Sequence, residues 1–208
     1  MKSGPLRIKC AAMLILASSS PRRRDLLTGY GYDFVICPAA IEEVAPDDMN
    51  VGDITLHNAR LKAEAVAKVA AETYPSGVVV GVDTLVALDG KSIGKPRDLD
   101  EAFRMLSTLS GRIHEVYSGV WLIPLAGGQP RAFVEVSRVK FKPLDAAAIR
   151  AYMARINPLD KAGAYAAQDD HPDGVVESIE GSRTNVIGLP MEALGKTLER
   201  MGITPRQG

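Results

Sequence analysis

The fold is decided by the stretch Met13-Leu14-Ile15-Leu16-Ala17-Ser18-Ser19-Ser20-Pro21-Arg22-Arg23-Arg24. Its first five residues form a short apolar run bounded by serines, which indicates a buried strand. Ser20 followed by Pro21 is typical of a helix N-cap with proline at the first helical position. The stretch therefore predicts a strand, a tight loop and a helix in that order.

The arginine triplet Arg22–Arg24 stands in the first turn of this predicted helix. Positive charge is unfavourable there, because the helix dipole already places partial positive charge at the N-terminus. Free backbone N–H groups, serine hydroxyls and guanidinium groups together suit the oxygens of a phosphate. An isolated basic triplet is more simply a solvated turn, but the serine and proline context favours a phosphate site.

Strands and helices alternate outward from this stretch. We expect further strands at 32–37, 78–82, 85–88, 116–125 and 131–141, and helices at about 53–73, 98–110, 145–155 and 191–201. Asp89-Gly90 is a hairpin signal, and residues 126–130 suit the turn of a longer hairpin. Hairpins among helices predict an α/β protein with a mixed sheet, in one domain over residues 1–208.

Asp83 and Thr84 separate two apolar, β-rich runs, at 78–82 and 85–88. We interpret them as an interruption of the strand, which is a common way to expose a functional carboxylate. An acid in a turn or a bulge fits the pattern about as well.

The Ala-rich segment 53–73 predicts an amphipathic helix. Its apolar stripe is expected to contain Ile54, Leu61, Ala65 and Val69, which recur at helical spacing. Lys62 lies off this stripe and is by default an exposed surface charge.

The composition limits the classes of protein that remain. The chain has 208 residues, 46% of them hydrophobic, and Lys plus Arg equal Asp plus Glu at 25 each, so it lacks the net positive field typical of nucleic-acid polymer binding. Cys10 and Cys37 are too few for a disulfide framework, which favours the cytoplasm. Basic residues before an apolar run at 10–17 resemble a short signal peptide, but the run is brief and we favour a strand. No apolar segment approaches the roughly 20 residues of a membrane span.

Several further motifs occur in a fixed order along the chain. They are Ile41-Glu42-Glu43, Ala59-Arg60-Leu61-Lys62-Ala63, Asp83-Thr84, Gly94-Lys95-Pro96, Tyr117-Ser118-Gly119-Val120, Asp160-Lys161-Ala162-Gly163-Ala164-Tyr165, Gln168 and Asn185-Val186-Ile187-Gly188-Leu189-Pro190. With the opening Leu16–Arg23 and Leu26-Leu27, this ordered set resembles the Maf family over about residues 13–195. Each short motif alone means little, but the ordered set is specific.

The resemblance implies a fold and an activity. The fold would be a two-lobed α/β structure with a mixed sheet, flanking helices and a central cleft, similar to the inosine triphosphatase superfamily. The activity would be that of a nucleoside triphosphate pyrophosphatase, which releases the monophosphate and pyrophosphate with a divalent cation, Mg²⁺ or Mn²⁺. Members of the family are often homodimers.

The resemblance also implies roles for individual residues. Asp83 would be the general base and, with Glu43, a metal-associated residue; Glu43 lies in an acidic loop whose other acids, Glu42, Asp47 and Asp48, we interpret as solvated. The expected phosphate-binding residues are Ser18, Arg23, Lys62 and Lys95, with Lys161 a weaker candidate. Arg22, Thr84 and Gln168 resemble the branch of the family acting on dTTP and UTP. A glutamine amide suits the edge of uracil or thymine because it donates and accepts at once, although a surface loop residue fits Gln168 about as well.

Other interpretations remain open. The family has been associated with arrest of septum formation, so a nucleotide-binding regulator of division without essential catalysis is one alternative, and a pyrophosphatase for modified nucleotides is another. A module for nucleic-acid polymers ranks last, because we find no basic stripe interleaved with aromatic residues. His57, His114 and His171 show no spacing typical of a triad or a zinc site, and we assign them no role.

Overall fold

The computed structural model describes residues 13–44, 46, 48–168, 171–172 and 174–206. Cys10, Asp47 and the first residues of the signal-like segment lie outside the described part. The strands are β1 (Leu14–Leu16), β2 (Phe34–Ile36), β3 (Val78–Leu88), β4 (Lys91–Ile93), β5 (Ile113–Pro124), β6 (Arg131–Phe141) and β7 (Val176–Glu180). The helices are α1 (Pro21–Gly29), α2 (Val51–Ala70), α3 (Leu99–Leu109), α4 (Ala146–Arg155), the 3₁₀ helix η1 (Ala162–Ala164), α5 (Arg183–Ile187) and α6 (Met191–Arg200).

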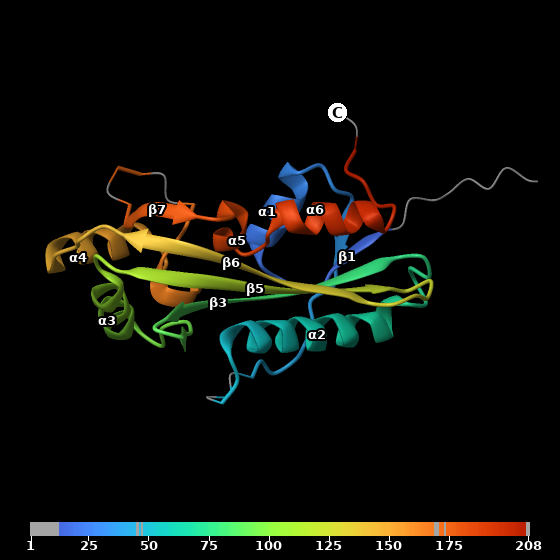
Figure 1. The fold of residues 1–208 in the computed structure, drawn as a ribbon, viewed down its shortest axis with the longest axis horizontal. Coiled ribbons are helices and arrows are strands. Elements are labelled where there is room, and N and C mark those ends of the chain that lie inside the picture. Colours follow the sequence, from blue (N-terminus) through green and yellow to red (C-terminus); the bar gives the residue numbers. More distant parts are fainter. Residues whose placement is uncertain (1–12, 45, 47, 169–170, 173, 207–208) are drawn as a thin grey trace, which may run out of the picture.

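One mixed sheet runs the length of the molecule (Figure 1). Its strand order is β2-β1-β3-β5-β6-β7, and β4 pairs with β3 outside this path. β1 is parallel to both β2 and β3. β5 is antiparallel to both of its neighbours, β3 and β6. The predicted α/β fold with a mixed sheet is therefore confirmed.

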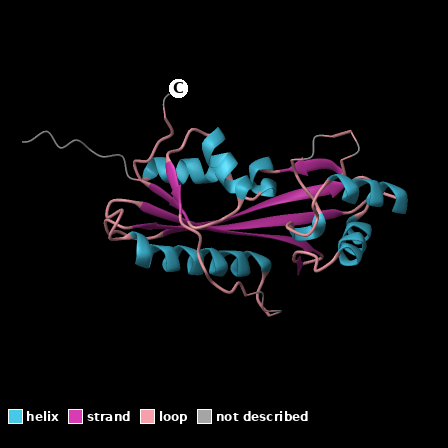
Figure 2. Ribbon diagram, turned by 180° about the vertical axis from the view of Figure 1, so that it is seen from behind, coloured by secondary structure: helices cyan, strands magenta, loops and turns pink. Residues whose placement is uncertain are grey.

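Helices cover both faces of the sheet. Figure 2 shows α2 along one face, with α1 and α6 along the other. The core on the α1 and α6 side joins Leu27 and Leu194 to apolar residues of β1 and β3. A separate core at the far end packs α3 and α4 against β5, β6 and η1. The two ends form lobes that share the long strands β3 and β5.

Helix α2 lies unusually close to the sheet, because two glycines face it. A Cβ atom on Gly81 would stand only 2.0 Å from the carbonyl oxygen of Ala59, and one on Gly119 only 2.4 Å from the carbonyl carbon of Thr55. Glycine is used where backbones approach this closely. The helix backbone therefore rests directly on β3 and β5.

The predicted apolar stripe of α2 was right at Ile54, which is 2% exposed, but wrong at Val69. Val69 is 67% exposed, and the buried face consists of Val51, Ile54, Thr55, Asn58, Ala59, Lys62, Ala63, Val66 and Ala70. The prediction followed the larger apolar side chains, whereas the close approach selects small residues for the contact. Lys62, expected at the surface, is consequently buried.

The predicted interruption of the strand at Asp83 was also wrong. β3 is continuous from Val78 to Leu88, and it pairs with β5 without a bulge from Val78 to Ala87. Asp83 and Thr84 fit inside the strand because each side chain finds polar partners on its own face of the sheet.

Four short elements were not among the predicted ranges, namely β4, η1, β7 and α5, although the hairpin signal at Asp89-Gly90 implies β4. Strand β7 pairs with the edge of β6 through the polar sequence Val176–Glu180, and it carries little apolar signal.

In the described part of the chain, no helix combines the length and the apolar character that a membrane span requires.

Candidate active site

The candidate site lies where the sheet changes partners along β3. β1 pairs with β3 only as far as Val80, and β4 takes up the same edge of β3 at Val86. Residues 81–85 lie between these two partners, and the loop 17–20 leaves the end of β1 beside them. Ligands commonly bind outside the carboxyl ends of parallel strands in α/β sheets, and β1 ends here.

A pocket at this position is lined by residues from widely separated parts of the sequence. The sequence-predicted residues among them are Arg22, Arg23, Glu43, Lys62, Asp83, Thr84, Lys95 and Gln168. Ser18, the remaining predicted residue, contacts this group from behind through Arg23. The structure thus brings together the residues that the sequence analysis selected.

Lys62 connects the two predicted acids. Its Nζ lies 2.7 Å from Oδ1 of Asp83 and 2.7 Å from Oε1 of Glu43, and it donates to the carbonyl oxygen of Val82 at 3.2 Å. Asp83 is 4% exposed and Lys62 8% exposed, whereas the Glu43 side chain is 52% exposed. A buried charge is costly unless it is paired and hydrogen-bonded, and this cluster provides both.

Asp83 has a second partner that sequence reasoning missed. Nδ2 of Asn58 donates to Oδ2 of Asp83 at 3.1 Å, so the two carboxylate oxygens bind different side chains of α2. Asn58 and Lys62 are four residues apart on that helix and therefore project from the same face. This spacing was the available signal.

The Arg23 guanidinium is fixed by three hydrogen bonds on the opposite face of β3. It donates to the carbonyl oxygen of Gly188 at 2.8 Å, to Oγ of Ser18 at 2.9 Å and to Oγ1 of Thr84 at 3.1 Å. Burial lowers the pKa of the guanidinium, while the carboxylates of Asp83 and Glu43 act to raise it. Arginine stays charged under such a shift, so the pocket holds a fixed positive charge.

Arg22 and Lys95 add positive charge at the mouth of the pocket. Nη1 of Arg22 lies 3.6 Å from Oδ2 of Asp160, a pairing that is largely exposed. Lys95 is exposed and lines the pocket from the segment after β4. Lys161, the weaker candidate, also lines it, and its Nζ donates to the carbonyl oxygen of Asn157 at 2.7 Å.

The other end of the pocket is mostly apolar. Val86, Val116, Tyr165, Ala166 and Ile187 line it, beside Gln168. Sequence reasoning had no separate signal for the valines, because each is typical of an ordinary strand. The pocket therefore has a cationic end around Arg23 and Lys62, and an apolar end, with an amide, around Val86 and Tyr165 where the other lysines also line it.

Comparison with known proteins identifies the family of this chain. The family model described as Maf-like protein matches residues 13–201. This chain belongs to the Maf family. Its relatives include two proteins named dTTP/UTP pyrophosphatase. The one from Carboxydothermus hydrogenoformans is 43% identical over 91% of this chain and 98% of the relative. The one from Pelotomaculum thermopropionicum is 41% identical over 91% of this chain and 96% of the relative. Among solved structures, the match to the Staphylococcus aureus Ham1 protein spans 62% of this chain and 71% of the Ham1 chain, with a TM-score of 0.43 and 15% sequence identity.

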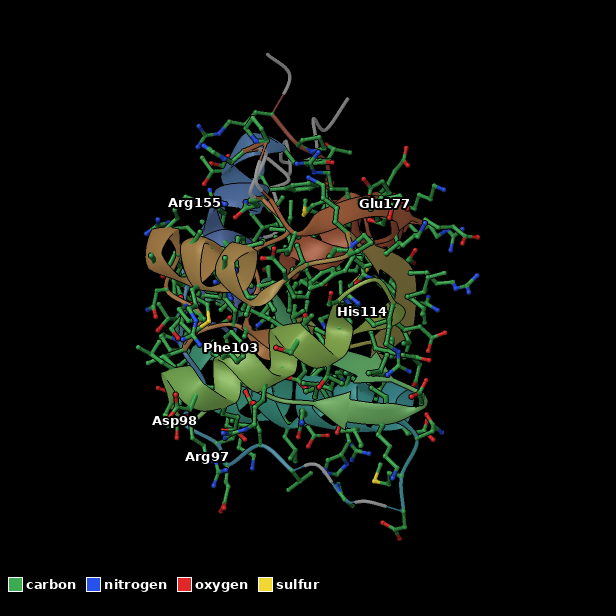
Figure 3. All side chains as sticks on the ribbon, turned by 90° about the vertical axis from the view of Figure 1, so that its left-hand side faces the viewer. Arg97, Asp98, Phe103, His114, Arg155 and Glu177 are labelled. Atoms are coloured by element: carbon green, nitrogen blue, oxygen red, sulfur yellow. The ribbon has the colours of Figure 1, made fainter. Side chains whose placement is uncertain are left out.

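The apolar end of this Maf pocket is backed by a buried histidine. His114 on β5 lies beneath Tyr165, and its Nε2 is 2.9 Å from the tyrosine hydroxyl. Phe141 and Tyr165 both meet the imidazole ring edge to face. Figure 3 labels His114 at the end of the molecule that α3 and α4 cover. Burial lowers the pKa of His114 to about 4 and raises the pKa of Tyr165 well above its ordinary range.

The donor set for a cation in this Maf site is small. Among the described residues, no three His, Cys, Asp or Glu side chains gather at one point. Asp83 and Glu43 are the two carboxylates that converge, each in contact with Lys62 Nζ. Mg²⁺ often binds proteins through only one or two carboxylates and completes its shell with water and substrate phosphates, so the residues present fit such an ion.

Proposed function

We propose that this Maf protein hydrolyses nucleoside triphosphates, with dTTP and UTP preferred, to the monophosphate and pyrophosphate. The observation that carries the proposal is the contact of Lys62 with both Asp83 and Glu43 inside the cationic end of the pocket. The relatives named dTTP/UTP pyrophosphatase, which align over nearly the whole chain, support the same activity.

The cationic end is the proposed phosphate site. Arg23, Lys62 and Lys95 would bind the phosphate oxygens, and Ser18 would fix the guanidinium of Arg23 through its hydroxyl. Groups already held in place stabilise developing negative charge without reorganising during the reaction. Arg23 meets this condition because each of its three nitrogen atoms has a partner.

Asp83 is the proposed general base. It would accept a proton from the water that attacks the α phosphorus, while the bond from that phosphorus to the oxygen bridging to the β phosphorus breaks and pyrophosphate leaves. Its position supports this role, because Lys62 and Asn58 hold the two carboxylate oxygens and thereby orient the group toward the pocket. A general base contributes about 10²- to 10⁴-fold to a rate.

Asp83 and Glu43 are the proposed ligands of a divalent cation, Mg²⁺ or Mn²⁺. When bound, such an ion would supply positive charge to the phosphate oxygens. The Lys62 ammonium contacts both acids, so Lys62 and the ion would together balance the negative charge of the two carboxylates.

The apolar end is the proposed base site. Gln168 would read the uracil or thymine edge, and Arg22 and Thr84 are the other proposed determinants of base preference. Thr84 would act indirectly, because its hydroxyl contacts Arg23 and the Ser118 hydroxyl, the latter at 2.8 Å. We also propose, from the family resemblance, that the protein is a cytoplasmic homodimer, and sedimentation of the purified chain would test the dimer.

The first experiment measures pyrophosphate release from canonical and modified nucleoside triphosphates, with and without Mg²⁺ or Mn²⁺. Asp83→Asn should lower kcat by about 10²- to 10⁴-fold. Asp89→Asn is the matched control, since Asp89 follows the same strand but pairs with Arg112 at the surface. Its activity should equal that of the unmodified chain.

The substrate panel separates this proposal from its alternatives. If pyrophosphate is released only from a modified nucleotide, the proposed reaction stands and the proposed preference for dTTP and UTP is rejected. Absence of release from every substrate, with nucleotide still bound by the unmodified chain and by Asp83→Asn, would instead support a nucleotide-binding regulator of division.

A further inference from the structure

Asn58 makes two hydrogen bonds to a loop backbone, in addition to its bond to Asp83, that the proposed mechanism does not use. The side chain is 2% exposed on the face of α2 that packs against β3. Its Oδ1 accepts from the backbone N–H of Val44 at 3.0 Å, and its Nδ2 donates to the carbonyl oxygen of Val44 at 2.9 Å. The same Nδ2 donates to Oδ2 of Asp83 at 3.1 Å. One amide therefore joins a loop backbone to a buried acid.

The loop that Asn58 holds is the one that carries Glu43. Val44 follows Glu43 directly, so the two hydrogen bonds to its backbone fix the position from which the Glu43 side chain projects. Neither Glu43 nor Val44 belongs to a helix or a strand. The ion pair with Lys62 ends in a carboxylate that is half exposed, and contact of this carboxylate with solvent weakens its hold on the loop. The buried amide is the stronger connection.

We propose that Asn58 is a positioning residue that fixes Glu43 and Asp83 relative to each other as a pair of cation ligands. The inference rests on the proposed function of these two acids. An amide suits the task because it offers an acceptor and two donors, which match the Val44 N–H, the Val44 carbonyl and the Asp83 carboxylate. Partners that orient metal ligands typically change affinity or activity by about 10- to 100-fold when they are replaced.

The test replaces Asn58 with leucine, which has the same branching and the same number of side-chain heavy atoms but no hydrogen-bonding atoms. Thr55→Val is the matched control, because Thr55 is buried on the same face of α2 and its hydroxyl bonds only to the carbonyl oxygen of Gly52 among the interactions described. Asn58→Ser is a second variant, too short to reach both partners, which provides the answer if the leucine variant fails to fold.

The decisive measurement is Mn²⁺ binding, followed by electron paramagnetic resonance in the presence of the non-hydrolysable α,β-imido-dUTP. We expect Asn58→Leu to raise the dissociation constant by about 10- to 100-fold and Thr55→Val to leave it unchanged. While most of the chain stays folded, destabilisation hardly changes a dissociation constant, so it would not produce this result. Hydrogen exchange of the Val44 amide should also accelerate in Asn58→Leu alone.

Two results would overturn the inference: Mn²⁺ affinity in Asn58→Leu equal to that of the unmodified chain, or an equal loss of affinity in Thr55→Val. Neither measurement requires turnover. If the unmodified chain releases no pyrophosphate, the proposed activity fails, while Mn²⁺ binding and Val44 exchange still decide the role of Asn58.

Discussion

His114 should make the stability of the protein depend on pH, because the folded chain resists its protonation. It is buried between Tyr165 and Phe141, where its Nδ1 has no hydrogen-bond partner among the described residues. Burial disfavours the charged imidazolium and lowers its pKa from the ordinary 6.5 to about 4. The unfolded chain therefore binds a proton at a higher pH than the folded chain does.

The size of the effect follows from these two pKa values. Because the pKa is depressed in the folded state, the stability is fully present above pH 6.5 and declines as pH falls toward 4. Each pKa unit corresponds to about 1.4 kcal/mol, so the two values give a loss of about 2.5 kcal/mol between about pH 7.5 and about pH 4.5. That is a large fraction of the roughly 5–15 kcal/mol by which a typical domain is stable.

The assay compares urea unfolding of the unmodified chain and of His114→Gln across this pH range. Glutamine can place an amide nitrogen near the position of Nε2 and keep the contact with Tyr165, but it does not titrate. Other groups shift both proteins equally, so the difference between their free energies of unfolding isolates His114. That difference should move by about 2.5 kcal/mol in favour of the variant as pH falls. A difference that stays constant with pH would refute the reasoning.

Three further changes have expected outcomes that the structure fixes. Gly81→Ala should cost at least about 3 kcal/mol in urea unfolding, since the new Cβ would stand 2.0 Å from the carbonyl oxygen of Ala59 and force α2 off the sheet. Arg23→Lys should lower kcat/KM for dTTP by roughly 10- to 100-fold, because an ammonium cannot reproduce the fork that makes three hydrogen bonds; activity equal to that of the unmodified chain would count against the phosphate role. Asp98→Ala should cost about 1 kcal/mol by thermal or urea unfolding, because it removes the N-cap bond to the Glu101 N–H.

Elements that begin or end at a local chemical signal were predictable from the sequence. Pro21 starts α1, Asp98 caps α3, and Asp145 caps α4 through the Ala148 N–H at 2.8 Å. In each case the signal and the structure that it sets lie within one helical turn. These predictions needed no knowledge of what packs nearby.

Features that depend on a distant part of the chain were not predictable in the same way. The buried face of α2 is determined by Gly81 and Gly119, which lie on two other elements. If the contact with these glycines is left out of account, the helical spacing of the larger apolar residues, including Val69, predicts a different buried stripe. β7 depends on the edge of β6 for its existence, because its own sequence is largely polar.

The candidate site shows why two ambiguous patterns can be decisive together. Asp83 alone was compatible with a break in the strand, and Lys62 alone with an exposed charge. In the structure Asp83 and Gly81 project from the same face of β3, toward α2, because side chains two residues apart on a strand share a face. Asn58 and Lys62 share a face of α2 with Ala59 and Ala63, which the glycine admits to close contact.

The glycine and the alanines thus serve the chemistry as well as the packing. A larger residue at position 81 would lift α2 away from β3, and with it both partners of Asp83. The Lys62 and Asn58 side chains would then no longer reach the two carboxylate oxygens together. Close packing of small residues is in this way a condition for the pair of hydrogen bonds that orients the proposed base. A small-residue contact between a helix and a strand, flanked by an acid on the strand and by polar residues four apart on the helix, is a pattern that sequence reasoning can search for as a unit.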